Sequence, residues 1–255
     1  MNININAPVK SQIPQLRALW REAFNDTEEF LDAFGTTAFS SQRCLGVTID
    51  NKIVAALYWF DCLYRDKPIA YLYAVATAKA YREQGICHKL MKYTHIHLTN
   101  RGYDGVILVP GTQNLFEFYA QMGYKSCSTI HEFDSLSIAP QIPIRQIDKN
   151  EYATLRRQFL PKDSVLQEKE NLDFLQTQVS FYAGTDFLLA ACRDENILHG
   201  IELLGEQTNA PGILHSLGCD KGFFRTPGGN LPFAMYLSLG DSILPPPKYF
   251  GLAFD

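Results

Sequence analysis

Apolar positions in the first part of the chain recur at spacings that predict two helices and then a β-hairpin. In "QIPQLRALWREAFND", Leu16, Leu19, Trp20 and Phe24 share one face of a helix. "EEFLDAFGTTAF" predicts a short second helix that should stop near Gly35. Two apolar runs then flank residues 50–52, a pattern typical of two strands joined by a tight turn.

The next segments alternate between strand and helix patterns up to about residue 135. "YLYAVAT" predicts a strand that ends near Thr77, and a helix follows Gly85. A strand is expected from about Gly105 to Val109, then a helix in "QNLFEFYAQMGYKS" that ends at Gly123, then a strand in "YKSCSTIHEF". This order predicts an α/β (α+β) domain, with a mixed central sheet flanked by helices, over residues 1–135.

The second half repeats some of these patterns. Residues 136–146 contain prolines and small residues and predict a linker, so that a second domain spans residues 147–255. "EYATLRRQFL" predicts a helix, "VLQEKENLDFLQTQVSFY" a further helical stretch, and "DFLLAACRDENILHGIELL" a hairpin around residues 193–196. Helix followed by hairpin occurs twice, which indicates an internal duplication. Two α/β halves that share common elements by chance explain the pattern equally well.

Composition narrows the class of protein. The chain has 255 residues, enough for two domains, and a formal net charge of −4, which argues against a broad basic surface for nucleic acid. None of the six cysteines forms a C-x-x-C pair or a zinc-like spacing, so we expect free thiols and no metal. No apolar run approaches a membrane span, and "MNININAPVK" does not resemble a signal peptide. The expectation is a soluble cytoplasmic protein without a membrane partner.

A candidate anion site lies in "YREQGICHKLM", directly after the strand that ends near Thr77. The first turn of a helix has backbone N–H groups without intrahelical partners, and its dipole favours negative charge. Gly85 permits a close approach of an anion, and Arg82 and Lys89 add positive charge, so the loop suits a phosphorylated cofactor. Taken alone, Arg-x-x-Gly also fits a plain strand–helix turn. The Walker and dinucleotide-binding fingerprints are absent.

This loop and a second motif further along the chain together resemble the motifs of the GNAT (GCN5-related N-acetyltransferase) family. Its main motif is a strand, then [QR]-x-x-G-x-[GA], then a helix; Arg82 and Gly85 match, and Cys87 replaces the usual Gly or Ala. "LFEFYAQMGY" is similar to the family's next motif, a helix with Phe-Tyr followed by Gly-Phe. Thr112 stands where many members have asparagine. The resemblance covers residues 1–135 and includes a second, degenerate half, as in tandem members.

The resemblance implies an acyl-CoA N-acyltransferase fold that uses acetyl-CoA as co-substrate. The strand ending at Thr77 should splay from the strand at 105–109, so that pantetheine binds the exposed strand edge and pyrophosphate binds the loop. Tyr119 falls on the tyrosine that many members use as general acid toward the coenzyme A thiolate; the alternative is a core aromatic. The implied cofactor-binding residues are Val75, Ala76, Thr77, Arg82, Glu83, Gln84, Gly85, Ile86, Cys87, Thr112 and Leu115.

The sequence does not single out the general base. Candidates are Asp61, Tyr73, His131 and Glu132, and many family members use a water chain instead. Two-half members use their C-terminal carboxylate near the thioester, so Asp255 is a further candidate. A Cys87 nucleophile would lack an assignable His or Asp partner.

The three histidines at 88, 95 and 97 form no i, i+4 metal pair and are expected at the surface. "FFRTPGGNLPFAMYL" contains a second Arg-x-x-Gly, at Arg225 and Gly228, but Pro227 removes an N–H donor. No second coenzyme A site is therefore expected. This half should pack against the first and help wall the acceptor cleft; a lipid-like pocket is the alternative.

The sequence thus predicts an acetyl-CoA-dependent N-acetyltransferase. It transfers an acetyl group to a primary amine of a small molecule by direct attack, with Tyr119 as general acid, and it is a monomer or homodimer. The alternative is a catalytically silent acyl-CoA-binding or regulatory protein. Aminoglycoside, polyamine, amino acid and protein amine all remain open as acceptors.

Overall fold

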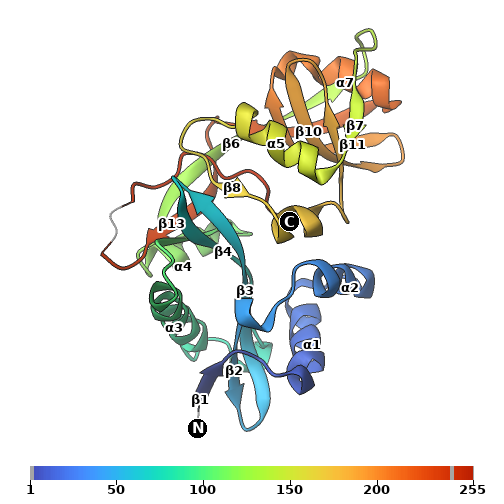
Figure 1. Cartoon of the computed structure of the whole chain (residues 1–255). Coiled ribbons are helices and arrows are strands. Elements are labelled where there is room, and N and C mark those ends of the chain that lie inside the picture. The colour runs from blue at the N-terminus through green and yellow to red at the C-terminus, as the bar shows by residue number, and fades with distance from the viewer. Residues whose placement is uncertain (1–2, 242–243, 255) are drawn as a thin grey trace.

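A mixed sheet runs through the whole protein, with helices on both faces (Figure 1). The computed structural model describes residues 3–241 and 244–254. Within that part the sheet has 13 strands, in the order β1-β2-β3-β4-β5-β13-β6-β12-β11-β10-β9-β7, with β8 paired to β3. The predicted fold class, a mixed central sheet flanked by helices, is confirmed.

The first half follows the predicted order closely. Its elements are β1 (Ile3–Asn6), α1 (Ile13–Phe24), α2 (Glu28–Thr37), β2 (Cys44–Ile49), β3 (Lys52–Tyr64), β4 (Lys67–Thr77), α3 (Ile86–Asn100), β5 (Gly105–Leu108), α4 (Gln113–Ala120) and β6 (Lys125–Leu136). Three details differ. The pattern did not predict β1, a four-residue strand paired with β2, and α2 continues past Gly35 to Thr37. Helix α4 ends at Ala120, before the predicted stop at Gly123.

The second half contains more strands than its pattern predicts. Its elements are β7 (Arg145–Ile147), α5 (Lys149–Phe159), β8 (Leu166–Gln167), α6 (Glu170–Leu175), β9 (Ser180–Ala183), β10 (Phe187–Asp194), β11 (Ile197–Gly205), α7 (Ala210–Leu217), β12 (Lys221–Pro227) and β13 (Leu231–Ser238); short 3₁₀ turns join some of them. The predicted helical stretch from 165 to 182 is wrong. Only α6 is helical there, because β8 pairs with β3 and β9 pairs with β10.

The last strand of the chain returns to the first half. β13 lies between β5 and β6, with Met235 opposite Leu108 on one side, while β12 pairs with β6. The hydrogen-bonded sheet therefore continues from the first half into the second without a break. The domain boundaries near 135 and 147 remain a sequence prediction.

Three apolar clusters cover the two faces of this sheet. One lies between the sheet of the first half and α3 and α4, and another lies under α7. The largest occupies the opposite face and is shared by α1, α2, α5, α6 and the chain segment after β13. Figure 1 shows α1 and α2 on the other side of β3 and β4 from α3. Both halves thus contribute side chains to the largest cluster, which covers the middle of the sheet.

A buried polar network fixes the segment that follows β13. The guanidinium of Arg156 donates two hydrogen bonds to Glu202, at 2.7 and 2.9 Å, and both side chains are buried. The phenols of Tyr152 and Tyr249 donate to the same carboxylate at 2.8 and 2.9 Å. Both oxygens of the Glu202 carboxylate thereby accept hydrogen bonds, which a buried charge requires. Tyr249 carries the terminal segment into the centre of the molecule.

Candidate active site

Strands β4 and β5 separate at the centre of the sheet. They pair in parallel only from Ile69 opposite Gly105 to Tyr71 opposite Ile107. β4 then continues to Thr77 with β3 on its other side, and a bulge at Ala74, whose φ is +48°, turns the strand. The strand edge beyond Tyr71 therefore faces a gap in which an extended ligand can hydrogen-bond to backbone groups.

The loop after β4 forms an open helix N-terminus. Gly85 adopts a φ of +71°, a region that favours glycine, and precedes α3 directly. The amide of Lys89 donates to the carbonyl of Gly85 at 3.1 Å, which is the first hydrogen bond of the helix. The amides of Ile86, Cys87 and His88 therefore have no intrahelical acceptor. A methyl group at Gly85 would meet no atom within 4 Å, so this face of the loop is open.

Arg82 and Thr77 join the loop to the end of β4. The Nε of Arg82 donates to the carbonyl of Thr77 at 3.0 Å, while the rest of this exposed guanidinium side chain stays beside the loop. The hydroxyl of Thr77 is buried without a hydrogen-bond partner in the described structure. An orphaned buried polar atom at the end of the strand that leads into this loop fits a site that a polar ligand completes.

Tyr119 reaches the same gap from α4. Its side chain is 7% exposed, and it packs edge-on against Tyr124, with 5.7 Å between ring centroids. Burial raises the pKa of Tyr119 above its ordinary value, and nearby Cys87 raises it further. The phenol thus stays protonated at neutral pH and can donate a hydrogen bond.

Cys87 is not an activated thiol. Burial raises its pKa to about 11, so the thiolate fraction at neutral pH is small despite the helix N-terminus. The side chain packs against the apolar cluster under α3 and α4. A nucleophilic role for Cys87 finds no support in this environment.

The prediction of three surface histidines on α3 is wrong for His95. Its Nε2 lies 2.8 Å from the hydroxyl of Tyr124, inside the layer under α3. Burial lowers the pKa of His95 to about 4, with a smaller contribution from His88, so the ring is neutral at pH 7. His95 supports Tyr124, on which Tyr119 packs.

A cavity of about 800 Å³ joins this gap to the second half. Val75, Thr112 and Leu115, three of the residues that the resemblance assigns to cofactor binding, line it from the first half together with Tyr119. Cys192, Ile201 and Arg225 line it from the second half, together with residues of β13 and Phe254. The loop at 82–87 lies outside this lining, and the side chains of Ala76 and Ile86 are buried in apolar clusters. Ligand contacts at those two residues can involve only their backbones.

Aromatic side chains surround the part of the cavity away from α4. Trp20, Phe24, Phe30, Tyr73 and Phe254 line it, and the indole Nε1 of Trp20 donates to Asp26 at 2.7 Å. The hydroxyl of Tyr73 donates to the carbonyl of Phe254 at 3.0 Å, which holds the terminal segment against β4. The sequence did not indicate Asp26 or Phe254 as site residues, because neither belongs to a local motif.

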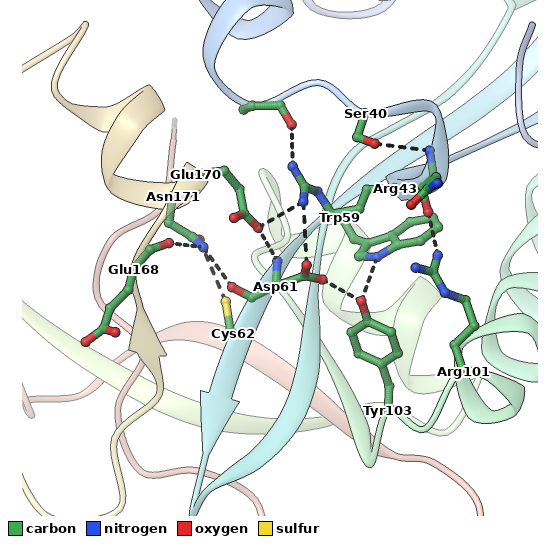
Figure 2. A network of polar contacts seen from close by, with 12 residues as sticks. Ser40, Arg43, Trp59, Asp61, Cys62, Arg101, Tyr103, Glu168, Glu170 and Asn171 are labelled. Atoms are coloured by element: carbon green, nitrogen blue, oxygen red, sulfur yellow. Dashed lines mark hydrogen bonds and ion pairs between the residues drawn. The ribbon is translucent and has the colours of Figure 1, made fainter.

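The four proposed bases are placed differently. Tyr73 and Glu132 line the cavity, whereas His131 stacks on Phe133, at 5.5 Å between ring centroids. Asp61 belongs to a polar network that ties β3 to α6 (Figure 2). It accepts a hydrogen bond from Tyr103 and lies 3.5 Å from Arg43. Asp61 does not line the cavity, and Asp255, a further proposed base, lies outside the described residues.

The second Arg-x-x-Gly motif does not open a helix. Arg225 belongs to strand β12, and Gly228 lies in the turn from β12 to β13. Helix α7 instead follows β11, where Pro211 lies in its first turn and has no N–H. The backbone amide of Glu206 in that connection donates to the backbone carbonyl of Asp186 at 3.2 Å. The loop after β4 is open, whereas the connection after β11 is packed against the turn before β10.

Within residues 3–241 and 244–254, no group of three or more His, Cys, Asp or Glu side chains is arranged to hold a metal ion. No helix in that part of the chain has the length and apolar character needed to cross a bilayer.

Comparisons with known proteins agree with this architecture. Residues 4–127 match the family model described as an acetyltransferase (GNAT) domain. Among solved structures, a GCN5-related N-acetyltransferase from Kribbella flavida superposes with a TM-score of 0.72 at 14% identity, over 92% of this chain and 70% of that chain. A conserved protein of unknown function from Enterococcus faecalis, a probable N-acyltransferase, gives 0.72 at 16% identity, over 94% and 73%.

A putative acetyltransferase from Pyrococcus horikoshii is also similar, with a TM-score of 0.65 at 12% identity, over 93% of this chain and 90% of that chain. At these identities the structures establish the fold. The comparison with curated proteins found no significant match. Residues 4–127 are thus similar to a GNAT acetyltransferase domain, and the chain shares its fold with solved structures described as GCN5-related N-acetyltransferases.

Proposed function

We propose that this protein is an acetyl-CoA-dependent N-acetyltransferase that acts on a primary amine of a small molecule. The observation that carries the proposal is the gap between β4 and β5, with an open helix N-terminus at one end and Tyr119 inside it. Acetyl-CoA supplies the thioester whose acetyl group is transferred. The residues around the gap would bind and orient acetyl-CoA and would protonate the departing thiolate.

The loop would hold the pyrophosphate through backbone amides. Three consecutive amides, from Ile86 to His88, lack intrahelical acceptors, and the helix dipole adds to their attraction for an anion. Gly85 keeps this face free of side chains, and Arg82 supplies a cation beside it. The edge of β4 from Tyr73 to Thr77 would hold the pantetheine arm, and Thr112 and Leu115 would flank it.

Tyr119 would serve as general acid. The amine nitrogen bonds to the acetyl carbon, the carbon–sulfur bond breaks, and the departing thiolate takes the phenolic proton of Tyr119. The raised pKa of Tyr119 keeps that proton in place at neutral pH. Solvent then reprotonates the phenol of Tyr119, and the surplus proton of the attacking amine leaves through the cavity. Asp255 remains a candidate base for that last step.

The second half would be a degenerate copy that does not bind coenzyme A. β11, α7 and the parallel strand β12 follow one another as β4, α3 and β5 do, and both strand pairs separate after a few residues. The connection after β11 offers no comparable cradle, because a Cβ at Gly205 would lie 2.1 Å from the carbonyl oxygen of Asp186. The second half would then form the wall of the cavity on the side where the acceptor amine binds.

Release of free thiol from acetyl-CoA across a panel of small amines tests the activity. Wild type should release thiol in proportion to acceptor, and Tyr119→Phe should do so far more slowly while still binding coenzyme A. A protein that binds coenzyme A but transfers to no amine would instead be an acyl-CoA-binding protein.

A further inference from the structure

The cavity next to Tyr119 continues onto the second half of the protein. A second cavity of about 500 Å³ lies on the face formed by β6, β10, β11 and β12. It shares Glu132, Cys192, Ile201 and Arg225 with the first cavity. The two hollows therefore form one trough that begins between β4 and β5 and ends over the second half.

The strand register explains why these side chains gather on one face. Arg225 of β12 pairs with Glu132 of β6, and Phe223 pairs with Asp134, so all four point to the same side of the sheet. Phe223 also stacks on His199 of β11, with ring centroids 5.7 Å apart. Phe223 is 46% exposed, although phenylalanine is usually buried, and its ring gives the trough an apolar floor.

Among the charged residues that line the trough over the second half, the carboxylates of β6 are more exposed than the guanidinium of Arg225. The Nε of Arg225 lies 3.3 Å from Glu132, and its guanidinium lies 4.7 Å from the ring centre of Phe233. The side chain of Arg225 is only 17% exposed, whereas that of Glu132 is 51% exposed. Asp134 is exposed as well. A ligand in the trough therefore meets carboxylate oxygens more readily than the guanidinium.

The other end of the trough is also suited to a cation. Asp26 lines the first cavity and accepts a hydrogen bond from Trp20, and aromatic rings of α1 and β4 line the same cavity. Aromatic faces attract cations, and more strongly where water is excluded. Lys221, whose Nζ lies 5.6 Å from the ring centre of Phe223, sits beside the far end and does not line either cavity.

From this arrangement we infer that the acceptor is an elongated amine with an apolar body and a second cationic group, held by Glu132 and Asp134. The inference rests on the proposed transferase activity, because the reacting amine lies at Tyr119 and the second cation lies on the second half. Ion pairing at an exposed site contributes modestly, so a preference of about tenfold is expected rather than absolute selectivity.

Three probes of equal chain length test the inference: an α,ω-alkanediamine, the corresponding monoamine and the corresponding ω-amino acid. Both calorimetric binding to the coenzyme A-saturated protein and thiol release are measured. Wild type should prefer the diamine by about tenfold over the monoamine, and the ω-amino acid should be the poorest ligand. Glu132→Gln with Asp134→Asn should bring the diamine-to-monoamine ratio close to one.

Two further variants sharpen the result. Asp134→Lys should favour the ω-amino acid over the diamine, because the far end of the trough then carries positive charge. Glu195→Gln, at the exposed turn between β10 and β11, removes an equivalent charge away from the trough and should keep the wild-type preference.

The two readouts separate this inference from the proposed function. Preferential binding of the diamine without any thiol release would support the trough and refute the transferase. Thiol release with equal preference for diamine and monoamine in wild type would support the transferase and overturn the inference. A preference that persists in the Glu132 and Asp134 double variant would overturn it too.

Discussion

Acidification should destabilise this protein through His95 in a way that can be measured. Burial under α3 lowers the pKa of His95 to about 4 from an ordinary value of 6.5. Between these two values the unfolded chain binds a proton that the folded protein refuses. The free energy of unfolding therefore falls as the pH falls through this window, and the contribution of the neutral ring is complete above it.

The size of the effect follows from the two pKa values. Going from pH 7 to pH 5, His95 alone should lower the free energy of unfolding by about 2 kcal/mol, because each unit of pKa difference corresponds to about 1.4 kcal/mol. This is a substantial share of the total stability of a typical protein, which is about 5–15 kcal/mol.

Urea unfolding followed by circular dichroism at pH 7 and pH 5 measures the effect in wild type and His95→Gln. Carboxylates such as Asp163, whose pKa is lowered beside Arg65, titrate in both proteins and cancel in the comparison. Wild type should lose about 2 kcal/mol more than the variant. Equal losses would refute the reasoning. Tyr124→Phe should keep the wild-type pH dependence, because burial is the main cause of the shift.

Two further predictions concern Tyr119 and the buried ion pair. Tyr119→Phe should lower kcat by about 100-fold with a much smaller change in the KM for acetyl-CoA. Because burial and Cys87 raise the pKa of Tyr119, any loss of kcat from its ionisation must begin above pH 10, and steady-state pH profiles showing an earlier loss would contradict the assignment. Arg156→Met should cost about 3–5 kcal/mol in urea unfolding, since it leaves Glu202 charged and buried. The double change with Glu202→Leu should recover most of that loss, and an additive loss would show that the pair is not coupled.

Local patterns predicted the elements around the loop before α3 well. Helical and strand periodicities are strong from β2 to β6, and the Arg82-to-Gly85 spacing marks a turn whose glycine needs a positive φ. The separation of β4 and β5, which the family resemblance implied, is present in the strand pairing. These features depend on neighbours close in sequence.

Features that depend on distant pairing were not predictable from local patterns. The stretch from 165 to 182 has helical periodicity, yet β8 and β9 form because strands elsewhere provide partners. Arg156 lies on a helix face expected to be apolar at Tyr152 and Leu155, and its burial requires Glu202, 46 positions later. The insertion of β13 between β5 and β6 likewise has no signal in its own residues.

The cavity shows the same limit. Asp26 belongs to no motif, Glu132 was expected only as one of several possible bases, and only the fold brings the two residues to one cavity. His95 follows a spacing that is compatible with the surface, and only the position of Tyr124 shows that its ring is partly buried.

Calorimetric titration of coenzyme A tests the central claim most directly. Wild type should bind one molecule, and Gly85→Asp should abolish binding because its carboxylate would repel the pyrophosphate. Gly85→Ala isolates the backbone strain at a φ of +71°, about 1 kcal/mol, and should weaken binding only several-fold. Gly228→Asp, at a φ of +90° with equally open surroundings in the second half, should bind like wild type. No heat in wild type, or an equal loss in Gly228→Asp, would contradict the assignment of the site to the loop before α3.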